Sequence, residues 1–162
     1  MVKRNRMDQC RKLFGCEAYN GMIYIVGGQL QMTNSATVTS LRYNIKTNRF
    51  EEIAILNKKR YGASLTEFNG EYLYAFGGHR THNCNYSKTS FERIKFSEMR
   101  ISTYWEDIEF DVGILEPENY LSCIPLNNTE IMIFGGQKNK LKFDEVYIYD
   151  VDLNILIKDD DC

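Results

Sequence analysis

Apolar and polar residues alternate with a period of two through much of this chain, in short runs. The most apolar runs are 22–26, 73–76 and 131–134. Each has the length of a strand, and none has the roughly 20 apolar residues that a membrane-spanning helix needs. The pattern therefore predicts an all-β chain that does not cross a membrane.

One hairpin layout occurs three times. An apolar strand reaches a turn, and a second strand then runs into a pair of glycines. The turn is Asn20-Gly21 in the first hairpin and Asn69-Gly70 in the second, and these residues tolerate the positive φ of a type I′ turn. Asn128-Thr129 is a weaker turn signal in the third. The glycine pairs are expected where strands end and backbones approach closely. They are Gly27, Gly28, Gly77, Gly78, Gly135 and Gly136.

A polar loop and two more strands follow each glycine pair. The third strand of each unit brings an aromatic residue (Tyr43, Phe96 and Tyr149), and the fourth carries Phe50, Trp105 or Leu156. Pro125 lies in the first strand of the third unit, which should be short or irregular because proline lacks a ladder donor. We expect units at 11–56, 60–110 and 119–158, between a basic tail at 1–10 and an acidic tail at 159–162.

These units resemble the kelch repeat, in which an apolar strand, Gly-Gly, a polar loop, an aromatic residue, six residues and a tryptophan recur. The resemblance covers about residues 11–158, although only the second unit keeps the tryptophan, Trp105. It implies that each unit is one four-stranded antiparallel blade of a kelch-type β-propeller. Kelch rings usually have five to seven blades, so about three blades make an incomplete ring.

An incomplete ring leaves two blade faces uncovered. Three explanations are open: a fragment of a longer chain, a half-ring completed by a second copy or a partner chain, or an open half-propeller within a large assembly. We expect residues 1–162 alone to dimerise, aggregate or require a partner.

The long connections should share one face of the propeller, because successive strands of a blade alternate in direction. They are 29–37, 79–89 and 137–143 within blades, and 56–60 and 111–119 between blades. The opposite face has only tight turns. Long loops on a rigid scaffold usually carry recognition, so we expect a partner to bind the long-loop face.

Arg11 and Arg60 stand ten residues before the turn glycines Gly21 and Gly70, at the start of their blades, and Asn119 takes this place in the third unit. In the kelch substrate adaptors of ubiquitin ligases, arginines at such positions often receive acidic or phosphorylated peptides. The alternative is that these arginines cap a strand or pair with a neighbouring carboxylate. The expected partner contacts are Arg11, Gln29, Arg60, Tyr61, His79, Arg80 and Gln137.

Composition narrows the function further. The net charge of −2 provides no basic field for nucleic acid, and five scattered cysteines indicate reduced thiols and a cytoplasmic location. His79, His82 and Cys84 share one loop, which we expect to be an ordinary polar loop without a metal; no cofactor is expected either. We therefore predict a protein-interaction module that serves as a scaffold or substrate-recognition subunit. A structural subunit or a fragment of a larger kelch protein is the alternative, and an enzyme is the least favoured class.

Overall fold

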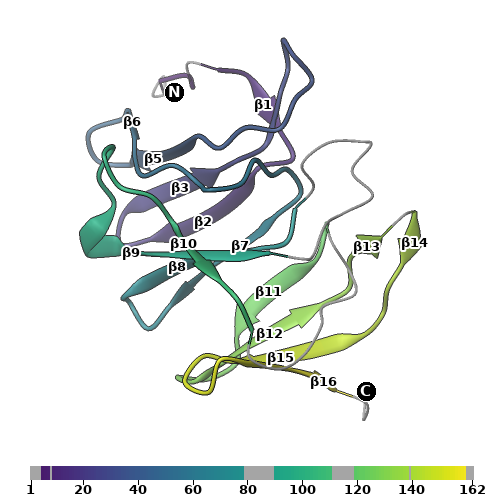
Figure 1. Cartoon of the computed structure of the whole chain (residues 1–162). Helices are drawn as coiled ribbons and strands as arrows, with labels where there is room; N and C mark the ends of the chain where they lie inside the picture. Colours follow the sequence, from purple (N-terminus) through teal and green to yellow (C-terminus); the bar gives the residue numbers. More distant parts are fainter. Residues whose placement is uncertain (1–4, 8, 79–89, 111–118, 139, 160–162) are drawn as a thin grey trace.

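The computed structural model describes residues 5–7, 9–78, 90–110, 119–138 and 140–159, and they form three four-stranded antiparallel sheets (Figure 1). Blade 1 contains β2 (Gly15–Tyr19), β3 (Met22–Val26), β5 (Ser40–Asn44) and β6 (Arg49–Glu52). Blade 2 contains β7 (Ser64–Phe68), β8 (Tyr72–Phe76), β9 (Phe91–Lys95) and β10 (Glu106–Ile108). Blade 3 contains β11 (Ser122–Pro125), β12 (Glu130–Phe134), β15 (Val146–Asp150) and β16 (Ile155–Asp159).

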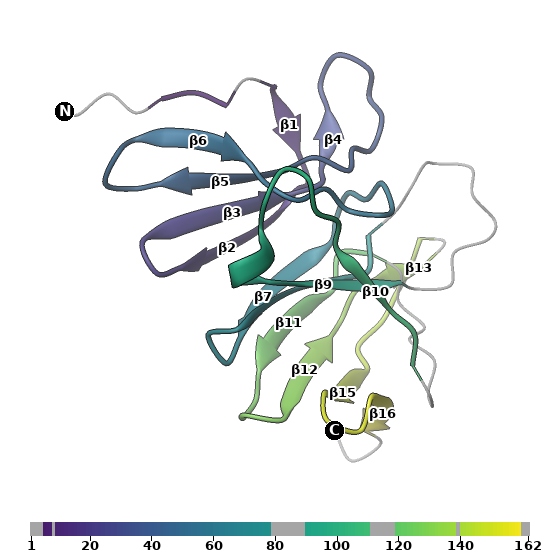
Figure 2. The same cartoon turned by 60° about the vertical axis from the view of Figure 1, so that its left-hand side comes forward.

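Strands follow chain order within each blade, and the blades fan out without closing a ring over the described residues (Figure 2). The predicted all-β fold of kelch-type blades in an incomplete ring is confirmed. Outside the blades lie β1 (Arg11–Lys12), paired with β4 (Gln29–Leu30), and β13 (Gln137–Lys138), paired with β14 (Leu141–Lys142). A 3-10 helix, η1, spans Phe96–Glu98. No helix among the described residues is long and apolar enough to span a bilayer.

Turn chemistry shapes the first hairpin of each blade. Asn20 and Gly21 have φ of 47° and 74°, and Asn69 and Gly70 have φ of 54° and 68°, as a type I′ turn requires. The third hairpin instead uses the side chain of Asn127, whose Oδ1 accepts hydrogen bonds from the backbone N–H of Thr129 (2.8 Å) and Glu130 (2.9 Å). Such a side-chain-supported turn needs no residue with positive φ.

The register of the sheets corrects the sequence alignment at Phe96. Tyr43 pairs with Ile23 and Tyr149 pairs with Ile131, whereas the equivalent partner of Leu73 in blade 2 is Ile94. Phe96 lies beyond the end of β9 and begins η1. Its ring stacks on Tyr19 of blade 1, with centroids 4.6 Å apart. The insertion that contains η1 explains why spacing alone misplaced the aromatic position.

The register also corrects the place given to Asn119. Leu13, Gly62 and Tyr120 have φ of 55°, 71° and 57° at the same point of their blades, so Asn119 corresponds to Tyr61 rather than to Arg60. The error arose because the third turn begins at Asn127, one residue earlier than the sequence alignment assumed.

Blade 3 agrees with the sequence prediction in one detail and differs from it in another. Pro125 ends β11, which is one residue shorter than β2 and β7, as expected from the missing N–H. Asp159 pairs with Val146 in the β15–β16 ladder, so strand β16 includes the first residue that was assigned to the acidic tail.

Two apolar cores hold the blades together. Between blades 1 and 2, Tyr24 and Val26 pack against a cluster from blade 2 that includes Leu73 and Trp105. Between blades 2 and 3, Tyr74, Phe76 and Phe91 of blade 2 pack against Ile131, Ile133, Tyr147 and Tyr149 of blade 3. Trp105 is 2% exposed and donates its Nε1–H to the carbonyl of Ala54, 3.1 Å away. Each core thus joins one face of a blade to the opposite face of the next.

Candidate protein-interaction face

The long connections lie along one edge of the three blades, opposite the tight hairpin turns (Figure 1). We call this edge the loop edge; its described parts are residues 29–37, the linker 56–60 and the β13–β14 hairpin. Two large apolar side chains project from it: Met32 is 99% exposed and Leu141 is 67% exposed. Exposed apolar side chains on loops are suited to contact with another protein.

Positive charge accompanies these apolar groups. Lys12, Lys59, Lys140 and Lys142 are exposed along the loop edge. Among the residues that the structure describes, none of these four lysines forms an ion pair. The loop edge therefore offers cationic donors that are free to bind an acidic surface.

Arg60 does not belong to this accessible surface. Its side chain is 1% exposed, and its guanidinium donates to the carbonyls of Gly77 and Ser90 and to the carboxylate of Glu92. Glu92 also accepts the backbone N–H of Asn57, at 2.7 Å. The alternative interpretation, pairing with a neighbouring carboxylate, describes these contacts, and the expectation of direct partner contact at Arg60 is corrected because its charge is buried between blades.

Arg11 repeats the same arrangement in blade 1. Its Nη1 donates to the carbonyls of Gly27 and Thr39, both at 3.1 Å, which are equivalent to Gly77 and Ser90 in blade 2. Burial lowers the pKa of Arg11, and the nearby Glu52 carboxylate opposes that change. Each arginine thus clamps the first glycine of its Gly-Gly pair to the start of the next strand.

Comparison with known proteins agrees with this repeated architecture. A model of the kelch motif matches residues 10–57, which span blade 1. Kelch-like protein 40 of Xenopus tropicalis is 31% identical over 119 residues, covering 72% of this chain and 18% of that protein. Kelch-like protein 13 of Homo sapiens is 35% identical over 75 residues, covering 44% of this chain and 11% of that protein.

The chain belongs to the kelch-repeat family. It spans less than a fifth of the length of the curated relatives it matches. Kelch repeats are typically protein-interaction modules without enzymatic activity.

The remaining predicted contact residues of this kelch chain are largely unavailable or undescribed. Tyr61 and Gln29 are buried, and the Gln29 amide donates to the carbonyl of Asn34 at 2.9 Å. Gln137 is half-buried and exchanges backbone hydrogen bonds with Asn119. His79 and Arg80 lie outside the described residues, as do His82 and Cys84. Within the described ranges, no group of three or more His, Cys, Asp and Glu residues could hold a metal ion.

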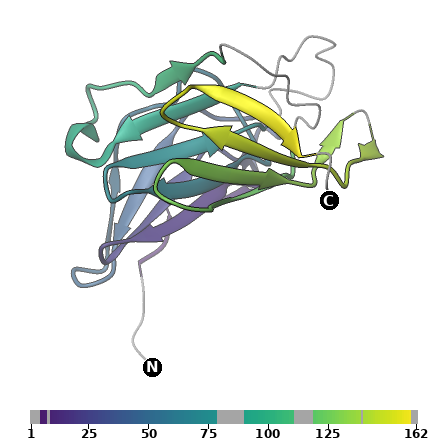
Figure 3. The same ribbon diagram turned by 90° about the horizontal axis from the view of Figure 1, so that it is seen from below.

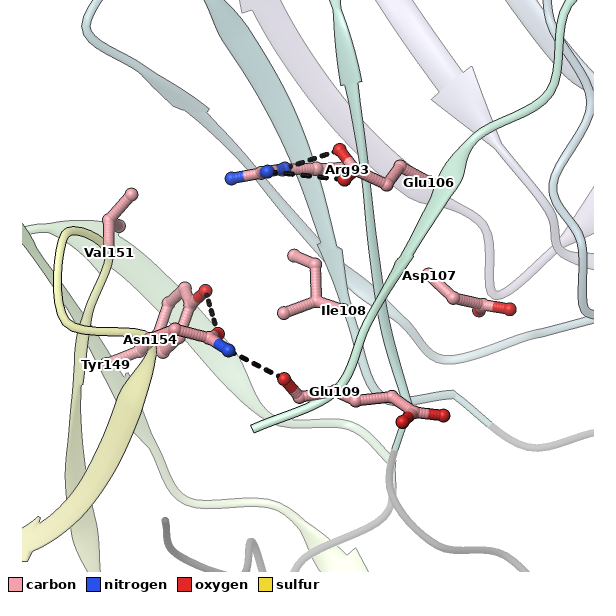
Figure 4. Close-up of a pocket in the computed structure, with 8 residues that line it drawn as sticks. All are labelled: Arg93, Glu106, Asp107, Ile108, Glu109, Tyr149, Val151 and Asn154. Carbon is pink, nitrogen blue, oxygen red and sulfur yellow. Dashed lines mark hydrogen bonds and ion pairs between the residues drawn. The ribbon is translucent and has the colours of Figure 1, made fainter. Parts of the chain in front are cut away.

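A pocket of about 280 Å³ lies where the last strand of blade 2 meets blade 3 (Figure 4). Its polar groups bind one another: Arg93 donates to Glu106 (2.8 Å), the Tyr149 hydroxyl to Asn154 Oδ1 (3.0 Å), and Asn154 Nδ2 to the Glu109 carbonyl (2.7 Å). The bond to Glu106 raises the pKa of Arg93. The bond from Asn154 to Glu109 joins the β15–β16 turn to the residue after β10, and the other two bonds lie within blade 3 and blade 2, so these contacts have a structural role.

Sequence reasoning named the long-loop face but missed the side chains that are accessible on it. Met32, Leu141, Lys59, Lys140 and Lys142 could have been found by asking which large residues in the long connections lie outside the alternating strand pattern. The arginines were preferred because their spacing repeats. In the structure, the repeated arginines donate to backbone carbonyls inside their own blades and are not available on the loop edge.

Proposed function

We propose that this kelch chain is a protein-interaction module that binds a partner through its loop edge. The observation that carries the proposal is the exposure of Met32 and Leu141 on connections of blades 1 and 3, which all project from the same side of a rigid β scaffold. Interfaces commonly combine exposed apolar anchors with a polar rim. In this role the chain acts in the cytoplasm as a scaffold or substrate-recognition unit, without catalysis.

The partner surface that fits best is acidic. Lys12, Lys59, Lys140 and Lys142 are exposed on the same side of the blades and would meet carboxylates or phosphates of a peptide. A lysine contributes a flexible point charge, whereas an arginine contributes a planar fork. The lysines should therefore favour an acidic segment in general over one fixed carboxylate geometry.

The test measures binding of the full chain to a panel of acidic, phosphorylated and neutral peptides by fluorescence anisotropy. Met32→Asp with Leu141→Asp should weaken binding of the acidic peptides at least about tenfold, because it removes apolar area and adds like charge. The matched control is Ile101→Asp, which changes an apolar residue that is 68% exposed at the opposite edge.

Equal loss of binding in the control and in the loop-edge variant would contradict a specific loop-edge site. A chain that binds none of the peptides would instead favour the second candidate, a structural subunit. The repeated arginine serves the fold in both blades, since Arg11 and Arg60 donate to equivalent backbone carbonyls.

A further inference from the structure

The connection that follows β4 forms a tip with Met32 at its apex. The Leu30 N–H donates to the Ser35 carbonyl (2.9 Å), and the Asn34 N–H donates to the Leu30 carbonyl (2.9 Å). The side-chain amide of Gln29 donates to the Asn34 carbonyl at the same distance, 2.9 Å. Both Figure 1 and Figure 2 show this connection projecting beyond β1 and β4. The bonds at the base of the tip therefore hold Met32 away from the blade, where it is 99% exposed.

The other methionines that the structure describes are shielded from solvent. Met99 is 6% exposed and belongs to the core between blades 1 and 2, and Met22 packs against the same core. Met7 and Met132 are half-buried. Exposure governs how readily a methionine reacts with a dissolved oxidant. Among the described methionines, Met32 is therefore the most accessible to oxidation.

Oxidation changes the character of a methionine side chain. Hydrogen peroxide transfers one oxygen atom to the sulfur, so the thioether is oxidised by loss of an electron pair and the peroxide is reduced to water. The product, methionine sulfoxide, is polar, and methionine sulfoxide reductases return it to the thioether. Burying such a polar group without a hydrogen-bond partner is unfavourable. A methionine that serves as an apolar anchor loses this property when it is oxidised.

We propose that Met32 is a reversible oxidation site, and that its sulfoxide weakens the binding of a partner at the loop edge. The effect on binding rests on the proposed function of that edge, where Met32 and Leu141 are the apolar anchors. Figure 3 shows the β13–β14 hairpin, which carries Leu141, extending beyond blade 3 at the end opposite its tight turns. Because leucine has no sulfur to oxidise, the anchor of blade 1 alone responds to peroxide.

The position of Met32 separates its oxidation from the stability of the fold. Because Met32 is almost fully exposed, a sulfoxide at this residue displaces no neighbour. A sulfoxide at Met99 would instead place a polar group in the core between blades 1 and 2. Oxidation of Met32 should thus weaken binding while the midpoint of thermal unfolding stays the same.

The first experiment maps the oxidation of the full chain by hydrogen peroxide. Tandem mass spectrometry of proteolytic peptides follows the gain of one oxygen atom at each methionine with time. Met32 should react at least about tenfold faster than Met99, which is its internal control. Thermal unfolding of the chain oxidised at Met32 should match that of the untreated chain. Equal rates at the two methionines, or loss of the fold on oxidation of Met32, overturn the site.

The second experiment measures the affinity for the acidic peptides by fluorescence anisotropy before and after peroxide treatment. Treatment should weaken binding by the wild type at least about fivefold, and methionine sulfoxide reductase should restore it. Met32→Leu removes the oxidisable sulfur, so its affinity, whatever the starting value, should not change on treatment. Met22→Leu is the matched control and should stay as sensitive as the wild type. A wild-type affinity that does not respond to peroxide overturns the effect on binding.

Oxidation of thiols is the competing explanation, since Cys10 and Cys16 are exposed and thiols also react with peroxide. Cys10 lies beside the loop, because its carbonyl accepts the Gln31 N–H at 3.0 Å. If oxidised thiols caused the loss of binding, Met32→Leu would remain sensitive to peroxide, and a thiol reductant alone would restore the affinity. That result overturns the proposal.

Leu141→Asp separates the failure of this proposal from the failure of the loop-edge function. If this variant weakens peptide binding and the sulfoxide at Met32 does not, the loop-edge function stands and the effect of oxidation is overturned. If the untreated wild type binds no acidic peptide, the loop-edge function fails, and the effect of oxidation on binding fails with it. Peptide mapping then still decides whether Met32 is a selective oxidation site.

Discussion

The guanidinium of Arg60 is paired with the carboxylate of Glu92, and both side chains are almost completely buried between blades 1 and 2. Arg60 comes from the linker between the blades and Glu92 from β9, so the pair fixes the linker to the third strand of blade 2. The backbone N–H groups of Asn57 and Lys58 donate to the same carboxylate. The pair therefore organises the whole connection between two repeats.

Removing Arg60 should destabilise the fold strongly. In Arg60→Ala the Glu92 carboxylate stays buried without its cation, and we expect a loss of about 3–5 kcal/mol in the free energy of unfolding. Urea denaturation followed by circular dichroism measures it. Arg42→Ala is the matched control, because Arg42 and Glu51 form a pair that is largely exposed; its loss should be at most about 1 kcal/mol. Similar losses in both variants would contradict a structural role for the buried pair.

Trp105 should contribute to the contact between blades 1 and 2 mainly through its buried ring. Trp105→Ala should cost about 3–5 kcal/mol in unfolding free energy, because it leaves a cavity in the core. Trp105→Phe should cost less, since it keeps most of the ring and loses the hydrogen bond to Ala54. Thermal unfolding followed by circular dichroism compares them. Equal midpoints for wild type and Trp105→Ala would show that the blades do not depend on this contact.

Gly27 and Gly21 provide a matched pair for the close approach of backbones. Both have positive φ, 63° and 74°, so alanine introduces similar backbone strain at each. A Cβ atom at Gly27 would lie 2.3 Å from the carbonyl oxygen of Arg60, whereas one at Gly21 would meet nothing within 4 Å. Gly27→Ala should therefore lower the unfolding free energy by about 1–3 kcal/mol more than Gly21→Ala. Equal losses in chemical denaturation would argue against close contact at Gly27.

Cys123 should make stability depend on alkaline pH. Burial raises the pKa of its thiol from 9.0 to about 12, although a hydrogen bond with Ser64 acts in the opposite direction. Because the folded state holds the proton more tightly, its contribution is complete below pH 9 and is lost as the pH rises towards 12. The unfolding free energy of wild type should fall more steeply over this range than that of Cys123→Ala. Parallel pH profiles would contradict burial of the thiol.

The arginines show where prediction from sequence reached its limit. The spacing indicated that Arg11 and Arg60 occupy one repeated position. In the structure, both side chains donate to backbone carbonyls at equivalent positions of their blades. Whether an arginine at that position faces solvent or the neighbouring blade depends on how the blades pack. The sequence left both alternatives open, and long-range contact with Glu92 decided between them.

Local chemistry is what the sequence by itself determined. The Asn-Gly turns, the apolar strands and the Gly-Gly pairs are set by preferences of a few adjacent residues, so the three blades could be predicted. The tertiary structure alone decided the equivalence of Ile94 with Tyr43 and the burial of Arg60. These features depend on register across strands and on contact between blades, which join residues far apart in the chain and leave no local pattern.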